Sequence, residues 1–391
     1  MATVLIIGGG PAGMMAAYAA QKNHHTVHLF EKNEQLGKKL LCTGHGRCNV
    51  TNRSADFLSH IVSNPKFLYS ALHTFSNQDM MRFLEQHHCP WIEEDQGRIF
   101  PKSQKARSIL DVMTSVLSTV SIHYNEPVRH LIVEKDTCIG IATTKQNYYG
   151  DCVILATGGL TFRQTGSTGD GFRMAQEIGI PIIPCRGGLV SLETKEHYDL
   201  QGISLPVSFA IAQKKRTYKD TGEILFTHFG LSGPAIINAS SSIQFPATLT
   251  MQLLPNREAH EIDHLLTNRA RNKDVLSAID FLPKRLGKVI CMQAKIDPKK
   301  KMHDLTKKER HHLVEQIQSF SFALIQPRPI NQAMITQGGI STKAIDAKTM
   351  TSKTIKHLKF AGEVIDVDGQ TGGYNLQIAW TTGFVAGSTI D

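Results

Sequence analysis

The N-terminal segment carries the feature that most restricts the fold, a glycine-rich turn between an apolar run and a helical segment. Residues 4–7, VLII, are typical of a buried parallel strand. Gly8, Gly10 and Gly13 follow in the spacing GxGxxG, and an alanine-rich run after them predicts a helix. Glycines in this pattern close a tight turn, let the backbone approach a pyrophosphate and let the helix pack on the strand. The segment therefore predicts a Rossmann-like α/β domain that binds a dinucleotide.

A second apolar run, residues 27–30, follows the helical segment and ends at Glu31. An acid about 20 residues after such a glycine turn accepts hydrogen bonds from the ribose of the dinucleotide. Strand, turn, helix, strand and acid therefore occur in the expected order. The same motif serves NAD and FAD, so other segments must distinguish the two.

Three further segments favour FAD. Residues 153–159 are an apolar run that ends in a glycine turn, where a cofactor can lie close to the main chain. Residues 358–363, LKFAGE, are another apolar run, and its final acid is suited to the ribityl chain. Residues 369–375, GQTGGYN, precede a helical run whose N-terminus can stabilise negative charge on a reduced flavin. We therefore expect FAD, bound non-covalently because no signature of covalent attachment is present.

The most distinctive stretch is residues 37–52, GKKLLCTGHGRCNVTN. Together with the C-terminal FAGEVIDVDGQTGGYN, it resembles the BaiN/RdsA-like FAD-dependent flavoproteins, a family that includes aminoacetone oxidase. The resemblance continues through GRIFPKSQKA, GSTGDG, FTHFGLSGPAI and TQGGIS, so it covers essentially the whole chain. One departure is His45, where many relatives have a smaller residue.

The resemblance implies an α/β fold in which an FAD/NAD(P)-binding Rossmann-like domain is split between the two ends of the chain. The insert is expected to be α+β, a small β-barrel with a helical piece. The expected limits are 1–189 and 328–391 for the FAD-binding domain, 190–256 and 319–327 for the barrel, and 257–318 for the helical insert.

The resemblance and the glycine turns together give a set of candidate cofactor-binding residues. They are Gly8, Gly10, Pro11, Ala12, Gly13, Glu31, Lys32, Lys38, Thr43, Gly44, Arg47, Cys48, Asn49, Val128, Thr157, Gly158, Gly362, Glu363, Gly372, Gly373, Tyr374 and Asn375.

The middle of the chain independently shows the pattern of an α+β insert. Apolar residues alternate with smaller or polar ones over 205–211, as in a half-buried strand. Residues 219–222, KDTG, are read as a turn that leads into a second strand. Thr306 and Glu309 fit a capping box that opens a helix through about Gln318.

Residues 284–310 are strongly basic. They contain ten Lys or Arg against three acids, a net +7 within a chain of +9. A smaller basic cluster lies at 214–216. Such a stretch indicates either a surface that tracks the phosphates of RNA or a solvated helical face, and the sequence leaves both open.

Two residues are candidates for catalysis. His228, within FTHFGLSGP, has a side chain whose ordinary pKa near 6.5 suits a general acid or base, but it is equally a candidate core histidine. Cys48 is either a proton donor or a buried residue that packs on the cofactor. Cys42 and Cys48 have five residues between them, whereas the two cysteines of flavin disulfide reductases have four. This spacing argues against a disulfide reductase. The histidine pairs lack metal-binding spacing, so no metal site is expected.

Composition limits the remaining classes. No apolar run reaches the roughly 18 residues of a membrane span, and the seven scattered cysteines suit a cytoplasmic protein with reduced thiols. The family resemblance implies an oxidoreductase. The first expected activity is oxidation of a small amine such as aminoacetone, with oxygen as acceptor and hydrogen peroxide as product. The alternative is NAD(P)H-dependent reduction of uridine in ribosomal RNA, which Lys284–Arg310 would bind.

Overall fold

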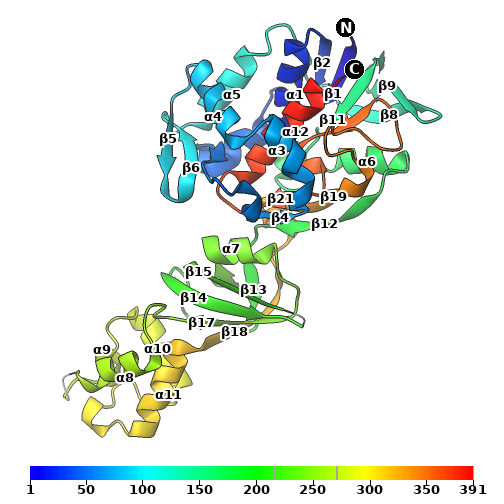
Figure 1. The fold of residues 1–391 in the computed structure, drawn as a ribbon. Coiled ribbons are helices and arrows are strands. Elements are labelled where there is room, and N and C mark those ends of the chain that lie inside the picture. Colours follow the sequence, from blue (N-terminus) through cyan, green and yellow to red (C-terminus); the bar gives the residue numbers. More distant parts are fainter. Residues whose placement is uncertain (215, 270–271, 391) are drawn as a thin grey trace. The chain divides into compact units, whose positions relative to one another are not determined.

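The computed structural model describes residues 1–214, 216–269 and 272–390. They form two compact units, one of residues 1–188 with 329–391 and one of residues 189–328. Both ends of the chain belong to the first unit (Figure 1). The domain limits at 189, 256, 318 and 327 remain predictions.

A five-stranded parallel sheet forms the centre of the first unit, in the order β20-β11-β1-β2-β7. Its strands are short, apolar and largely buried, as expected of a sheet covered on both faces. This confirms the Rossmann-like fold that the N-terminal motif predicted. The strands are β1 (Thr3–Ile7), β2 (Thr26–Phe30), β7 (Ser121–His123), β11 (Cys152–Leu155) and β20 (Leu358–Phe360).

Two helices from opposite ends of the sequence, α1 (Pro11–Lys22) and α12 (Tyr374–Ser388), pack closely together. Small residues make this possible. A Cβ on Gly383 would lie 2.3 Å from the carbonyl oxygen of Ala12, and one on Gly387 would lie 2.2 Å from that of Ala16. The close helix pair fixes the C-terminal segment against the glycine turn.

Further helices and small sheets complete the first unit (Figure 1). The helices are α2 (Lys38–Cys42), α3 (Tyr69–Thr74), α4 (Asn77–Gln86), α5 (Ala106–Ser115) and α6 (Asp170–Glu177). The small sheets are β8 (Val128–Glu134) with β9 (Thr137–Thr143) and β10 (Asn147–Tyr149); β3 (Thr51–Asn52) with β6 (Arg98–Pro101) and β5 (Trp91–Glu94); β12 (Ile182–Gly188) with β19 (Ile335–Ile340); and β4 (Ile61–Ser63) with β21 (Asp368–Gly369).

A closed six-stranded barrel forms part of the second unit. Alternate residues of β14 are buried, as the sequence pattern predicted. The strands in barrel order are β13 (Leu192–Thr194), β16 (Gly230–Ser232), β15 (Thr217–Phe226), β14 (Ser204–Ala212), β17 (Ala247–Gln252) and β18 (Phe320–Pro327), and helix α7 spans Pro234–Ser240.

The predicted turn at 219–222 is wrong, because these residues lie inside β15 and pair with β14. Gly222 belongs there for a packing reason: a Cβ at this position would lie 3.0 Å from the Cβ of Ala235 in α7. The reversal occurs earlier in the chain, where Gln213 N donates to Arg216 O. Lys215, in the smaller basic cluster, lies outside the described residues.

Helices between β17 and β18 make up the rest of the second unit and share one apolar core with the barrel (Figure 1). The predicted capping box is present, since Thr306 Oγ1 accepts from Glu309 N and the Glu309 carboxylate accepts from Thr306 N. The helices are α8 (Ala259–Thr267), α9 (Val275–Ala278), α10 (Lys284–Gln293) and α11 (Lys307–Gln318).

Candidate active site

The first unit contains a cavity that is partly open to solvent. Its walls come from the glycine turn, the end of β2, helix α2, the turn after β11, the start of β19 and the start of α12. Segments far apart in sequence therefore meet around one space.

The three glycines of the turn have different roles. Gly8 has φ +103°, and a Cβ there would lie 2.5 Å from the carbonyl oxygen of Ala156. A Cβ on Gly13 would lie 1.9 Å from the carbonyl oxygen of Gly8. A Cβ on Gly10, in contrast, would meet no protein atom within 4 Å, and Gly10 lines the cavity. Gly8 and Gly13 are thus needed for packing, whereas Gly10 leaves room for a ligand.

The start of α1 is suited to an anion. Gly10 is the N-cap residue, Pro11 is the first helical residue, and no side chain caps the helix there. The first-turn N–H groups and the positive end of the helix dipole therefore remain available to phosphates. This arrangement fits the pyrophosphate of FAD.

Glu31 lies at the end of β2 with a buried, fixed carboxylate. Its Oε2 accepts a hydrogen bond from Gly9 N at 2.9 Å, and its Oε1 accepts from Asn33 N at 2.9 Å and from Asn33 Nδ2 at 2.6 Å. The hydrogen bonds hold the acid beside the glycine turn, where a ribose of the cofactor is expected.

A second acid, Glu363, links three walls of the cavity. Its Oε2 lies 2.6 Å from Lys39 Nζ, and its Oε1 accepts from the backbone N–H of Thr336 at 2.8 Å. Thr161 Oγ1 contacts both Glu363 and Lys39. Because Lys39 is in α2, Thr161 follows β11 and Thr336 is in β19, one carboxylate joins segments that only the fold brings together.

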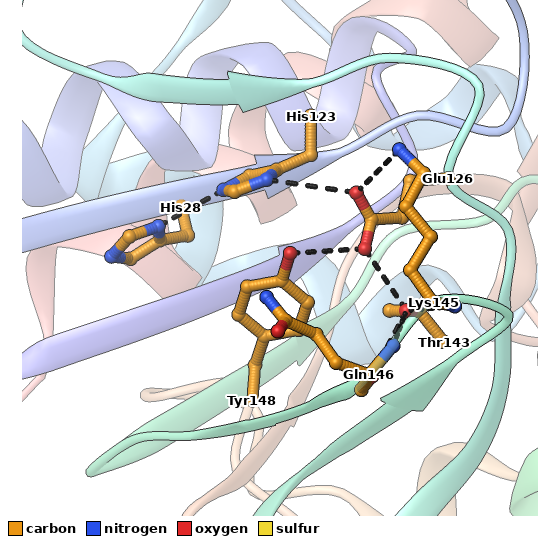
Figure 2. Close-up of polar contacts among 7 residues, drawn as sticks. All are labelled: His28, His123, Glu126, Thr143, Lys145, Gln146 and Tyr148. Carbon is orange, nitrogen blue, oxygen red and sulfur yellow. Dashed lines mark hydrogen bonds and ion pairs between the residues drawn. The ribbon is translucent and has the colours of Figure 1, made fainter.

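Glu126 belongs to a polar network beside the cavity (Figure 2). Tyr148 OH and Thr143 Oγ1 donate to its Oε1 at 3.0 and 2.9 Å, and Lys145 Nζ lies 3.1 Å from its Oε2. Burial alone would raise the pKa of Glu126, but the hydrogen bonds from Lys145, Thr143 and Tyr148 hold this pKa below its ordinary value. The carboxylate therefore stays charged and fastens the segment before Val128 to β9 and β10.

The network continues away from the cavity through two histidines. His123 Nδ1 lies 3.8 Å from Glu126 Oε2, and His123 Nε2 lies 3.0 Å from His28 Nδ1 (Figure 2). The His123 ring stacks on Phe30, with ring centroids 4.4 Å apart. Burial lowers the pKa of His123, so its ring is neutral at neutral pH.

Two buried polar atoms of predicted segments lack a partner in the described part of the chain, namely Thr157 Oγ1 and Asn49 Oδ1. Buried polar atoms are rarely left unpaired in folded proteins, so such an atom in a cavity wall is a candidate for bonding to a ligand. Thr157 lines the cavity directly. Together with the open space at Gly10 and the anion site of α1, this fits bound FAD.

The structure separates the candidate cofactor-binding residues into two sets. Those that line the cavity are Gly8, Gly10, Pro11, Ala12, Glu31, Lys32, Lys38, Thr43, Val128, Thr157, Gly158, Glu363 and Asn375. Those outside the lining are Gly13, Gly44, Arg47, Cys48, Asn49, Gly362, Gly372, Gly373 and Tyr374. The contact of each residue with FAD remains a prediction.

Several residues of the second set support the walls. Arg47 pairs with Glu94 at 2.7 Å and lies over the Phe100 ring. Gly373 has φ +99° at the N-cap of α12, and a Cβ there would lie 2.3 Å from the carbonyl oxygen of Thr51. These positions are therefore fixed by packing as well.

The two candidate catalytic residues lie in different surroundings. Cys48 is fully buried and does not line the cavity, and desolvation raises the pKa of its thiol to about 12, so it is not a thiolate nucleophile at neutral pH. Cys42 is exposed, and both cysteines are free. His228 is exposed in the bend between β15 and β16, with its ring 5.0 Å from that of Phe229. The catalytic roles of His228 and Cys48 remain predictions.

Sequence reasoning missed several residues of the cavity wall, including Lys39, Asn33, Glu126, Thr336 and Asp368. Lys39 stands next to the predicted Lys38, and Thr336 and Asp368 lie in motifs that carried the family resemblance. No local signal marked Glu126, because its partners are brought to it by β9 and β10.

The described residues contain neither a candidate metal centre nor a helix suited to span a membrane. No group of three or more histidine, cysteine, aspartate or glutamate side chains is placed to hold a metal ion. Within the same residues, every helix falls short of the length and apolar character that crossing a bilayer requires.

Known proteins share this architecture. The ribosomal RNA dihydrouridine synthase of Haemophilus influenzae is 30% identical, over 99% of this chain and 98% of that protein. The 3-dehydro-bile acid delta(4,6)-reductase of Clostridium scindens is 28% identical, over 98% and 97%. A solved structure, the 3-ketosteroid-delta4-(5alpha)-dehydrogenase of Rhodococcus jostii RHA1, shares the fold with a TM-score of 0.53 at 14% identity, covering 99% of this chain and 96% of that one.

The family model described as HI0933-like protein Rossmann domain matches residues 2–389. This confirms the family resemblance that the motifs indicated, and it agrees with a cavity that carries the dinucleotide fingerprint. The chain therefore belongs to the HI0933-like family and is an FAD-dependent oxidoreductase.

Proposed function

We propose that this protein reduces uridine in ribosomal RNA to dihydrouridine, with FAD as the redox cofactor and NAD(P)H as the electron donor. The bound flavin supplies hydride transfer. The cavity of the first unit holds the flavin and the target base, and the basic helical part of the second unit binds the RNA backbone.

The observation that carries this proposal is the state of the lysines in residues 284–310. Within the described residues, seven of them are exposed and in no ion pair: Lys284, Lys288, Lys295, Lys299, Lys301, Lys307 and Lys308. Only three cations of the stretch are paired, Lys300 with Glu309, Arg310 with Asp263 and Arg285 with Asp199. Unpaired, solvated ammonium groups remain available to phosphates.

A relative of this chain with 30% identity over almost its full length is named a ribosomal RNA dihydrouridine synthase. Another relative of nearly equal identity is named a bile acid reductase. Identity alone therefore does not choose between RNA and a small molecule. The seven unpaired lysines favour RNA, because a compact substrate needs no basic surface outside the cavity.

Oxidation of a small amine becomes the second candidate. A closed, uncharged cavity would favour such a substrate, whereas eight ionisable side chains line this one. One observation keeps the amine in consideration: Asp368 lies in the cavity wall, and its charged form would pair with an ammonium group.

The test compares electron donors under anaerobic conditions. The yellow holoenzyme is mixed with NADPH, with NADH or with aminoacetone, and loss of flavin absorbance is followed over time. We expect bleaching by a nicotinamide nucleotide and little by aminoacetone. Faster bleaching by aminoacetone, with hydrogen peroxide formed when air is readmitted, would make the protein an amine oxidase.

A further inference from the structure

We propose that Asp368 is the catalytic acid of this enzyme, the group that gives a proton to the substrate when its carbon–carbon double bond is reduced. The inference rests on the proposed function for the identity of the substrate. It follows from comparing every ionisable side chain that lines the cavity.

No histidine, cysteine or tyrosine is among the described residues that line the cavity, so the proton donor must be sought among lysines and acids. Three lysines line it, and each is engaged: Lys32 with Asp170, Lys38 with Glu34 and Lys39 with Glu363, at 2.6–2.7 Å. These ion pairs hold the ammonium groups in place.

Four of the five acids in the wall are in ion pairs or have partners at both carboxylate oxygens. Asp170 and Glu363 are in those ion pairs, and both oxygens of Glu31 and of Glu126 accept hydrogen bonds or pair with a cation. These carboxylates hold the walls of the cavity and are poorly suited to carrying a proton to a ligand.

Asp368 differs from all of them. Its Oδ2 accepts a hydrogen bond from Gln337 Nε2 at 2.9 Å, while Oδ1 has no hydrogen-bond partner in the described part of the chain. The residue is only 2% exposed, in β21 immediately before the loop that leads to α12. Asp368 therefore gives the cavity wall a buried carboxyl, and its Oδ1 lacks the protein partner that such an atom normally has.

The surroundings of Asp368 favour its protonated form. Desolvation raises the pKa of Asp368, and the nearby carboxylate of Asp366 raises it further. The hydrogen bond from Gln337, the nearby Ser63 side chain and the charge of Arg186 act in the opposite direction but do not cancel the effect. A carboxyl whose pKa is displaced toward neutrality can both donate a proton and recover it from solvent.

One protonated carboxyl supplies the single proton that reduction of the uracil ring needs. Reduction of the uracil ring breaks the π bond between C5 and C6 and forms two C–H bonds. Bound FAD, reduced by NAD(P)H, would supply the hydride, which accounts for the electron pair and the hydrogen at C6. Asp368 gives a proton from its O–H to C5, becomes a carboxylate, and is protonated again from water.

The experiment uses the holoenzyme, reduced with NADPH without oxygen and then mixed with an unmodified ribosomal RNA transcript. Return of flavin absorbance reports reduction of the RNA. In the wild type, this rate should fall as pH rises through the pKa of Asp368, because only the protonated carboxyl donates. Asp368→Asn keeps the shape of the side chain but should react about 100-fold more slowly, as expected for loss of a general acid, with no such pH dependence.

Two further measurements separate catalysis from packing. Rates for Asp368→Asn are therefore given per bound FAD, and Asp366→Asn, which does not line the cavity, should keep the FAD content and the rate of reduction by NADPH. Asp366→Asn removes a neighbouring negative charge, so it should lower the pKa of Asp368 and move the pH profile to lower pH while keeping the maximal rate. An unchanged return of absorbance in Asp368→Asn would overturn the assignment, as would a loss of FAD that accounts for the whole effect.

An infrared pH titration tests the carboxyl without any substrate. The wild type should show a protonated carboxyl signal that persists above the range of ordinary aspartates and is absent from Asp368→Asn. If the wild type reduces no uridine, the proposed function fails. The infrared signal then tests by itself whether the Asp368 carboxyl holds a proton. A signal that remains in Asp368→Asn, or no signal in the wild type, refutes the role of Asp368.

Discussion

The charged side chains of the cavity and those of residues 284–310 differ in their exposure and in whether they form ion pairs. In the cavity, six of the eight ionisable side chains are in ion pairs, and some of these pairs join distant segments, as Lys39 and Glu363 illustrate. In the basic stretch, most lysines are exposed and unpaired. Partly buried charges need partners to offset desolvation, whereas exposed lysines remain solvated at little cost. Cavity charges therefore maintain structure and cofactor binding, while the lysines can be changed without disturbing either.

The largest effects should come from the glycine turn. Gly13→Val places side-chain atoms where a Cβ already lies 1.9 Å from a backbone oxygen, so it should yield little folded protein. A Cβ at Gly10 would meet no protein atom within 4 Å, so Gly10→Val should fold normally but bind no FAD. Circular dichroism and flavin absorbance distinguish the two outcomes. Yellow Gly10→Val protein with normal FAD content would show that the pyrophosphate does not lie at Gly10.

Glu31→Ala should have the next largest effect. It removes a charged acceptor of hydrogen bonds, worth about 1.5–3 kcal/mol, so affinity for FAD should fall by about 10- to 100-fold. An FAD titration of the apoprotein measures this. A greater loss than that of Gly10→Val would contradict the placement of the dinucleotide site.

The pair of Lys39 and Glu363 should behave as a unit. Lys39→Met and Glu363→Gln should each lower the free energy of unfolding by about 1–2 kcal/mol, reduced because both side chains remain partly exposed. The double variant should lose less than the sum, since the pair is already broken in each single variant. Additive losses in denaturant titrations would mean that the two residues act independently.

The lysines should affect RNA binding and nothing else. Changing Lys299, Lys301 and Lys308 to Ser should flatten the log–log dependence of RNA affinity on salt by about 0.7–0.9 for each lost phosphate contact. FAD content and bleaching by NADPH should stay the same. Lys300 is left unchanged because it pairs with Glu309 at 2.7 Å. An unaltered salt dependence would identify the stretch as a solvated face.

The smallest effect concerns Glu309, one of the three acids within the basic stretch. Lys300 and Thr306 lower its pKa from 4.5 to about 2. Because the folded pKa is depressed, the stabilisation is present above pH 4.5 and is lost as pH falls toward 2. Glu309→Gln should therefore unfold with a weaker dependence on acid, by about 1 kcal/mol after allowing for solvent exposure. Equal acid sensitivity of both proteins would exclude this contribution.

Local patterns accounted for much of what the sequence predicted correctly. The strand, glycine turn and helix at 4–13 depend on neighbouring residues, as does the capping box of Thr306 and Glu309. The turn expected at 219–222 failed because pairing with β14 outweighed local turn preference. The contacts of Glu126, and the meeting of Lys39 with Glu363, depend on pairings far apart in the chain, which no local pattern specifies.

The most direct test of the account is nucleoside mass analysis of ribosomal RNA incubated with the holoenzyme and NADPH. We predict that uridine gains two hydrogens at a specific position, that the change requires both FAD and NADPH, and that Gly10→Val abolishes it. The variant with Ser at 299, 301 and 308 should need more RNA to reach the same yield. RNA that stays unreduced while the flavin is bleached by NADPH and reoxidised by a small unsaturated compound would contradict the assignment of RNA as the substrate.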